Sequence, residues 1–192
     1  MAKKKKNRSG KGSQFERDIC RELSRWWTGG KRDDVFWRTS TSGARATVRK
    51  RKGKSTAGSY GDIMAMDPIG VPLLDFTTIE LKRGYSKGSP LDLVDGSKES
   101  CAIWYGWVRQ ATEAWESSGS LSWWLITKRD AREILVSMPQ YQFELLDIPE
   151  PPLSLSFSFP FLVDVVKTFR LQYLLEHMKP AGICKLTSPL KR

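Results

Sequence analysis

Apolar residues recur along this chain at two spacings, one typical of helices and one typical of strands. Near the start the spacing is three or four residues, which gives one apolar helix face formed by Phe15, Ile19, Leu23 and Trp26. Ser13 precedes this run as the expected N-cap, and Thr28-Gly29-Gly30 ends the helix. A second amphipathic helix is expected over residues 98–117, on the apolar positions Ile103, Trp104, Trp107, Val108, Ala111 and Trp115.

Short runs rich in β-branched and aromatic residues predict strands. They lie at residues 35–38, 62–66, 73–82, 121–127 and 133–138. Asp67-Pro68-Ile69-Gly70 carries turn chemistry, so the second and third strands are expected to form a hairpin. A short helix is expected at 139–146, an alternating stretch at 153–159 and a helix at 163–177. This order of elements predicts an α/β fold with a mixed sheet.

The Pro-rich segment at residues 148–152 is the strongest boundary signal in the chain. We therefore expect a main domain over residues 13–148, with a mobile basic loop at residues 43–60. Residues 149–192 are expected to form an appendage, which either packs back on the core or contributes to a dimer interface. Residues 1–12 are Lys-rich and lack apolar periodicity, and are expected to be a disordered basic arm.

Positive charge is concentrated in the first third of the chain. The net charge is +11, and residues 1–60 hold 18 Lys and Arg against 5 Asp and Glu. The remaining residues hold 14 Lys and Arg against 16 Asp and Glu. Such asymmetry favours a polyanionic partner, above all nucleic acid, because basic side chains neutralise its phosphates. The alternative is a solubilising tail with a solvated face.

Several function classes lack the residues that they need. No apolar run reaches the roughly 18 residues of a membrane-spanning helix, and no apolar core follows the Lys-rich N-terminus. Cys20, Cys101 and Cys184 form no CxxC pair, so we expect a cytoplasmic protein without zinc or disulfides. His177 is the single histidine, which leaves a Ser-His-Asp hydrolase without a base. No GxxxxGK[ST] loop is present, so no nucleotide cofactor is expected.

Asp62, Glu80 and Lys82 are the candidate catalytic residues. Glu80 and Lys82 are two positions apart on a predicted strand and share a face, while Ile79 and Leu81 share the other and can face the core. The predicted hairpin would bring Asp62 beside Glu80. Two adjacent carboxylates repel each other unless a cation lies between them, and hard oxygen ligands suit Mg²⁺ or Mn²⁺. A lysine there can orient an attacking water and stabilise charge that builds on phosphorus.

A bland alternative exists for the Glu80 and Lys82 pair. Most Glu-x-Lys triplets are ordinary surface pairs on an edge strand, because both residue types are common at surfaces. Three features occurring together favour the catalytic interpretation. The triplet ends an apolar strand, a Gly-Asp strand precedes it at hairpin distance, and a basic loop lies immediately upstream.

This pattern resembles the signature of the PD-(D/E)xK nucleases, in which an aspartate precedes a Glu-x-Lys triplet on a β-hairpin. Here Gly61 stands before the aspartate in place of proline. The chain also resembles the archaeal-type Holliday junction resolvases over roughly residues 12–135. The further motifs that carry this resemblance are Gly12-Ser13-Gln14-Phe15-Glu16-Arg17 and Arg38-Thr39-Ser40-Thr41-Ser42-Gly43. The loop at residues 43–60 is longer than expected for that family, which puts the role of Ser42 in doubt.

The resemblance implies a restriction-endonuclease-like core, a mixed central sheet flanked by helices, and roles for single residues. Asp62 and Glu80 would bind the metal with the Leu81 carbonyl, and Lys82 would act on the attacking water. Glu16 would reach the metal directly or through water, although Ser13-x-x-Glu16 also fits a capping box that only closes a helix start. Gln110 lies where related nucleases often place a site glutamine, but a polar residue at the edge of the core is the favoured interpretation.

DNA contacts are expected from the basic segments. The resemblance places Arg38 and Ser42 at the scissile phosphate or its neighbour, with ordinary strand-end and turn residues as the alternative. The basic arm and the basic loop would bind phosphates, the loop through Arg45, Arg49, Lys50, Arg51, Lys52 and Lys54. The tryptophans at 104, 107, 115, 123 and 124 are expected to pack in the core rather than stack on bases.

The expected function is that of a Holliday junction resolvase, which hydrolyses DNA phosphodiesters at four-way junctions with Mg²⁺. A two-fold symmetric junction favours a homodimer. Two alternatives remain: a nuclease that cuts another DNA structure or site, and a non-catalytic basic module that binds nucleic acid. A phage, a plasmid or a cell could use such an enzyme, and the long basic loop favours a phage.

Overall fold

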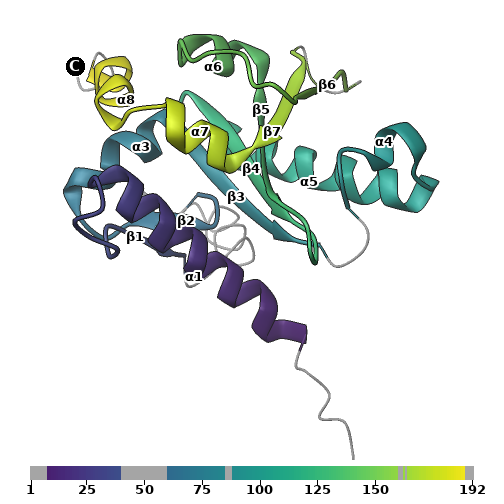
Figure 1. Cartoon of the computed structure of the whole chain (residues 1–192), viewed down its shortest axis with the longest axis horizontal. Helices are drawn as coiled ribbons and strands as arrows, with labels where there is room; N and C mark the ends of the chain where they lie inside the picture. The colour runs from purple at the N-terminus through teal and green to yellow at the C-terminus, as the bar shows by residue number, and fades with distance from the viewer. Residues whose placement is uncertain (1–7, 40–59, 85–87, 160–161, 163, 189–192) are drawn as a thin grey trace, which may run out of the picture.

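The computed structural model describes residues 8–39, 60–84, 88–159, 162 and 164–188 (Figure 1). Five strands form the main sheet in the order β3-β4-β5-β7-β6. Their bounds are β3 Thr77–Arg83, β4 Ser122–Lys128, β5 Ile134–Pro139, β6 Leu155–Phe157 and β7 Val166–Arg170. β3 and β4 are parallel, and the other neighbouring strands are antiparallel. The sheet is therefore mixed and flanked by helices, which confirms the predicted α/β class.

Helices cover both faces of this sheet. Successive residues of β4 point to opposite faces, so Trp124 and Ile126 belong to one buried cluster while Trp123 and Leu125 belong to another. The first cluster includes α1 (Arg8–Trp27) and α7 (Leu171–His177), and the second includes α5 (Lys98–Glu116). Figure 1 shows α1 and α7 in front of the sheet and α5 on its other side. The predicted core role of Trp104, Trp123 and Trp124 is confirmed, since all three are fully buried.

A second, two-stranded sheet lies beside β3. It pairs β1 (Phe36–Arg38) with β2 (Ile63–Ala65) in antiparallel register. The predicted hairpin between 62–66 and 73–82 is wrong, because β2 pairs with β1 and a 3-10 helix, η1 (Pro68–Gly70), is followed by helix α3 (Val71–Phe76). Prolines at the start of η1 and α3 favour helical turns there. Leu73 and Phe76, three residues apart, are fully buried.

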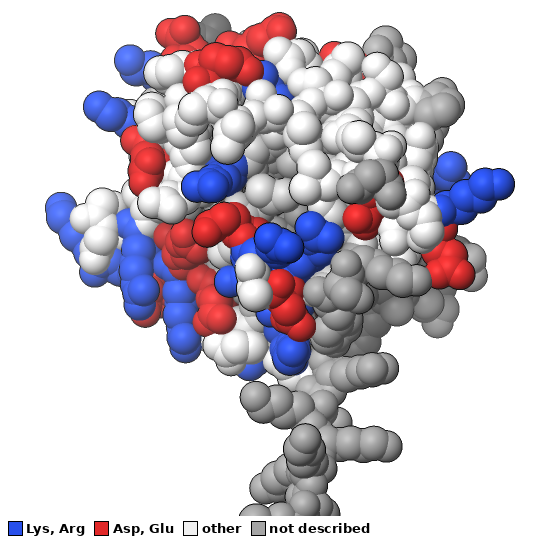
Figure 2. Space-filling view, turned by 45° about the vertical axis from the view of Figure 1, so that its right-hand side comes forward, with Lys and Arg blue, Asp and Glu red and all other residues white. Residues whose placement is uncertain are grey.

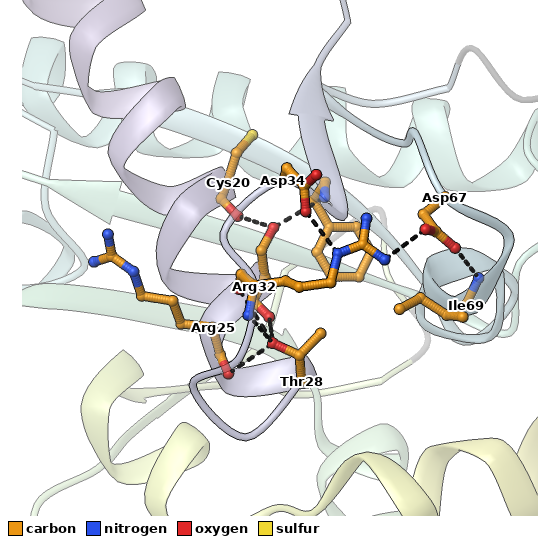
Figure 3. Close-up of polar contacts among 9 residues, drawn as sticks. Cys20, Arg25, Thr28, Arg32, Asp34, Asp67 and Ile69 are labelled. Atoms are coloured by element: carbon orange, nitrogen blue, oxygen red, sulfur yellow. Dashed lines mark hydrogen bonds and ion pairs between the residues drawn. The ribbon is translucent and has the colours of Figure 1, made fainter.

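Polar contacts fix α1 against β1 (Figure 3). Ser24 is fully buried, and its hydroxyl donates to the Cys20 carbonyl and accepts from the Phe36 amide at 2.7 and 2.9 Å. The Arg32 guanidinium joins Asp34 and Asp67 at 2.8 and 2.6 Å. These contacts set the register of the first helix relative to the first strand, and both of these elements carry candidate site residues.

Helix α1 begins earlier than the sequence predicted. It starts at Arg8, so Ser13 lies inside the helix and is not its N-cap. Lys11 forms an ion pair of 3.3 Å with Asp130 in the turn between β4 and β5, which holds the first turns of the helix to the sheet. Residues 8–12 are therefore helical rather than part of a disordered arm, and residues 1–7 lie outside the described part.

The C-terminal segment completes the main sheet. β7 pairs with β5 and β6, so the sheet continues across the boundary that was predicted near residue 149. The helix predicted at 163–177 is instead β7 followed by α7. Lys167 lies inside that strand and is almost fully buried. Its ammonium group contacts Glu150 and the ring of Phe143, which makes this burial possible. The segment thus packs back on the core, which was one of the two possibilities left open for it.

Three short helices complete the described fold, namely α4 Asp92–Asp95, α6 Gln140–Leu145 and α8 Pro180–Thr187. α5, β4, β5 and α6 lie within two residues of their predicted bounds. None of the described helices has the length and apolar character needed to cross a membrane.

Candidate active site

Strand β3 presents Glu80 and Lys82 on the face that α5 covers. Ile79 and Leu81 alternate with them and belong to the buried cluster on the opposite face. This confirms the sequence prediction that Glu80 and Lys82 share a face. The Glu80 carboxylate is nevertheless largely buried, with 4% of the residue exposed. An ordinary surface pair on an edge strand would not be buried in this way, so the interpretation of Glu80 and Lys82 as a surface pair does not fit the structure.

Asp62 is held beside β3 by backbone contacts rather than by a hairpin. Its amide donates to the Ile79 carbonyl at 2.8 Å, and its carboxylate Oδ2 accepts from the Leu81 amide at 2.9 Å. Its carbonyl accepts from the Thr39 amide at 2.9 Å. Three bonds to two neighbouring segments thus fix the position of this side chain next to Glu80.

Gly61 makes that close approach possible. Its φ is +76°, in the left-handed region that favours glycine. A Cβ at this position would lie 2.6 Å from the Ile79 carbonyl oxygen. The glycine that replaces the motif proline is therefore required by the geometry of this segment against β3.

Lys82 and Gln110 both contact the Glu80 carboxylate. Lys82 Nζ lies 3.0 Å from Glu80 Oε2 and 3.9 Å from Asp62 Oδ2, so one ammonium faces two carboxylates. The Gln110 amide, which projects from α5, donates to Glu80 Oε2 at 3.0 Å. Gln110 was interpreted as a polar residue at the core edge; the residue is exposed, and its amide reaches Glu80, which places it beside the candidate site.

Burial raises the pKa of both carboxylic acids. The pKa of Glu80 rises to about 7, first because of burial and then because of the adjacent Asp62 carboxylate, while Lys82 opposes the rise. Burial likewise raises the pKa of Asp62, against the opposing effects of Lys82 and the Leu81 amide. One lysine does not neutralise two buried carboxylates. Binding of a proton or of an added cation would therefore reduce the uncompensated negative charge of the site.

Glu16 of α1 and Arg38 of β1 form a second polar group. Arg38 Nη1 lies 3.1 Å from Glu16 Oε2 and donates to the Ser13 hydroxyl at 3.3 Å. Because α1 begins at Arg8, Ser13 and Glu16 are not at a helix start and cannot form the capping box that the sequence allowed. Burial and then the charges of Glu16 and Asp62 raise the pKa of the Cys20 thiol to about 12. The negative charges of Glu16 and Asp62 thus both affect the Cys20 thiol.

The donor set fits a hard divalent cation with open coordination positions. Among the described residues, no three His, Cys, Asp or Glu side chains form a group that could hold a metal ion. Asp62 and Glu80 form a carboxylate pair, while Glu16 is occupied by Arg38. The Leu81 amide points toward Asp62, and the amide and carbonyl of a strand residue point to the same side, so the Leu81 carbonyl also faces that edge. Oxygen donors of this kind suit Mg²⁺ or Mn²⁺.

The remaining predicted site residues are Ser42 and six residues of the basic loop. Ser42, Arg45, Arg49, Lys50, Arg51, Lys52 and Lys54 lie outside the described residues. Figure 2 shows how charge is distributed on one face of the described part. Lys and Arg side chains lie mainly toward the left and the lower centre of this view, intermixed with acidic ones, while acidic side chains gather at the top and the uncharged surface lies mostly at the upper right.

Comparison with known proteins gives one family match. Residues 7–156 match the model of a family described as "phage putative PDDEXK endonuclease". No curated protein and no solved structure matches the chain. The matched residues include Glu16, Arg38 and the Asp62, Glu80 and Lys82 group, and the mixed sheet with flanking helices is consistent with a restriction-endonuclease-like fold. The chain therefore belongs to this family of PD-(D/E)xK endonucleases.

Proposed function

We propose that the chain is a Mg²⁺-dependent endodeoxyribonuclease that resolves four-way DNA junctions. The observation that supports hydrolysis most strongly is the buried pair of Asp62 and Glu80 with Lys82 beside it, in a chain of an endonuclease family. The junction preference rests on the resemblance to junction resolvases. Two of the motifs that carry it also contact each other, through Glu16 and Arg38.

Asp62, Glu80 and the Leu81 carbonyl would hold the cation, and Mn²⁺ is expected to substitute for Mg²⁺. Bound there, the cation would supply positive charge that favours deprotonation of a water and stabilises the pentacovalent phosphorus. Gln110 keeps Glu80 oriented through its amide. A cation fits this position because the two buried carboxylates carry more negative charge than the one lysine beside them can neutralise.

The protein side chains then act on a water and a phosphate. Lys82 orients the attacking water and donates hydrogen bonds to anionic oxygen. The water oxygen bonds to phosphorus and its proton is lost to solvent, while the bond from phosphorus to the 3′-oxygen breaks and that oxygen takes up a proton from solvent. The products carry a 5′-phosphate and a 3′-hydroxyl, as in the family. We further propose that Glu16 is a positioning residue, which orients the Arg38 guanidinium toward the phosphate.

DNA would be bound by the basic arm and the basic loop, and Ser42, which directly precedes that loop, would contact the phosphate. Paired cuts on a two-fold symmetric junction favour a homodimer. Most apolar residues of the segment 153–175 are committed to the core, but Leu153 is 72% exposed beside the edge strand β6. We propose this edge of the C-terminal segment as the dimer interface. We also propose a phage source, which agrees with the description of the family.

Cleavage of a synthetic four-way junction by purified protein with Mg²⁺ tests this function. We expect symmetric nicks across the junction, which disappear in Glu80→Ala while DNA binding survives. The matched control is Glu113→Ala, an exposed glutamate of α5 that should cut normally. Equal cutting of a linear duplex of the same sequence would replace the junction preference with another DNA target. Absence of metal-dependent cutting on every substrate would leave only a DNA-binding module.

The oligomeric state is tested separately by analytical ultracentrifugation of the protein alone and with the junction. A dimer is expected, and Leu153→Asp should weaken it without loss of folding. A monomer on the junction would contradict the dimer, although not the nuclease activity.

A further inference from the structure

A cavity lined by arginines opens on the same face of the sheet as Lys82. It is an open pocket of about 220 Å³ between the start of α4 and the ends of β4, β5 and β7. Arg129, Arg132 and Arg170 line it together with Glu133 and Ser89. We refer to it as the arginine cavity. Its arginines come from sequence positions up to 41 residues apart, in the part of the chain whose overall charge is slightly negative.

The sheet register connects this cavity to the candidate active site. Lys82 pairs with Thr127, which pairs with Leu135, which in turn pairs with Arg170. Partners in adjacent strands project on the same face, so these side chains form one row across the sheet. Neighbouring strands are about 4.8 Å apart, which places Arg170 about 14 Å from Lys82 along this row.

The charges in the cavity favour an anion. Arg129 Nη1 lies 3.9 Å from Asp92 Oδ1, and the other oxygen of Asp92 accepts from the amides of Gly88 and Ser89. Arg132 and Arg170 form no ion pair within the described part of the chain. With Glu133 as the acidic residue of the lining, the guanidinium groups are in excess. Planar guanidinium forks match the oxygens of a phosphate.

We infer that the arginine cavity binds a backbone phosphate of the DNA strand that is cut, about two nucleotides from the cleaved bond. The inference rests on the proposed function, because it takes the Asp62 and Glu80 group as the cutting centre. Along one DNA strand the axial rise is about 3.4 Å per nucleotide, but the phosphates also wind around the helix axis and lie farther apart than this rise, so about 14 Å corresponds to about two nucleotides. The row from Lys82 to Arg170 thereby defines the direction in which the strand runs over the sheet.

Binding without metal tests the cavity independently of cleavage. The full chain and the variant Arg132→Ala/Arg170→Ala are titrated with labelled DNA in EDTA over a range of salt concentrations. The slope of log K against log salt should fall by about 1 in magnitude, the value for one lost phosphate contact. The control Lys179→Ala/Lys185→Ala removes the same charge from exposed positions at α8 and should leave the slope unchanged. Equal slopes in all three proteins would overturn the inference.

The position of the phosphate is tested with DNA that carries single neutral methylphosphonates. In the wild-type protein, the neutral group about two nucleotides from the cut should weaken binding about tenfold, consistent with loss of a charged hydrogen bond. In Arg132→Ala/Arg170→Ala the methylphosphonate at that position should weaken binding no further, because the arginines that would contact the phosphate are already absent. Additive effects would contradict the contact. If the wild type binds DNA but never cuts it, the proposed function fails while the salt slopes still decide whether the cavity binds phosphate.

Discussion

The Gln110 amide donates a hydrogen bond of 3.0 Å to Glu80 Oε2, and so ties helix α5 to the strand that carries the acidic group of the site. Lys82 Nζ contacts the same oxygen at 3.0 Å. Two donors thus converge on one carboxylate atom, which favours the charged form of Glu80 against the burial that disfavours it. This arrangement makes the side chain of Gln110 part of the machinery that prepares Glu80 for a cation.

Replacing Gln110 should therefore weaken metal binding more than it weakens folding. In Gln110→Ala we expect a loss of about tenfold or more in Mn²⁺ affinity, which is usual when a partner of a metal-binding group is removed. Calorimetric titration with Mn²⁺ measures this directly. Gln172→Ala is the matched control, because its amide also bonds a glutamate, Glu176, but far from the site. Unchanged Mn²⁺ affinity in Gln110→Ala would contradict the role.

The raised pKa of Glu80 predicts a pH-dependent stability in the absence of metal. Its folded pKa of about 7 exceeds its ordinary value of 4.5, so the native state holds the proton more tightly. The resulting stability is present below about pH 4.5 and is lost as the pH rises through about 7. Glu80→Gln removes this loss and should be about 2 kcal/mol more stable than wild type at pH 8, with a smaller difference at pH 5.

Urea unfolding in EDTA at several pH values measures the effect, with Glu113→Gln as a surface control. A constant difference between wild type and Glu80→Gln would contradict the assignment. Cleavage at limiting metal should rise through about pH 7, because the carboxylate must lose its proton to accept a cation.

Gly61 should tolerate no side chain. Gly61→Ala places a Cβ against the Ile79 carbonyl and strains a positive φ, so we expect a loss of about 2 kcal/mol or more in unfolding free energy. Gly106→Ala is the contrasting control, because that exposed helical glycine has open space around its Cβ and should gain about 0.5–1 kcal/mol. Chemical denaturation of both variants gives the comparison. Equal stabilities would show that the Asp62 segment is not held as described.

Glu16 should matter for cleavage rather than for helix formation. Glu16→Gln removes the ion pair with Arg38 but no helix cap, so the thermal midpoint should change little while kcat falls at least tenfold. DNA affinity in EDTA should not decrease, which separates positioning from binding. Asp18→Asn on the exposed side of the same helix is the control. A normal kcat in Glu16→Gln would contradict the positioning role.

The local part of the site could be predicted from sequence. Glu80 and Lys82 share a face because strand residues two apart always do, whatever the rest of the fold. The position of Asp62 depends on contacts across the fold, so the correct neighbourhood was predicted by way of a hairpin that does not form. Gln110 had a family signal, but its helical position alone did not reveal which strand its side chain would meet.

The C-terminal part shows a different limit of sequence analysis. Val166, Lys167, Thr168 and Phe169 belong to a buried strand, and a buried lysine conceals the apolar pattern of such a strand. Lys167 is tolerated because Glu150 and Phe143 meet its ammonium group. These partners are distant in sequence, and only the folded structure brings them together.

The parallel pairing of β3 with β4 also determines when the enzyme becomes active during its synthesis. A ribosome releases Asp62, Glu80 and Lys82 before α5 and β4 exist, so the nascent chain carries these residues without the strand and the glutamine that hold them. Two parallel strands can pair only after the segment that connects them has been made, and contacts between residues distant in sequence form slowly. The arrangement of the candidate site can therefore be completed only after β4 has been made, and chains truncated before Ser122 should lack it.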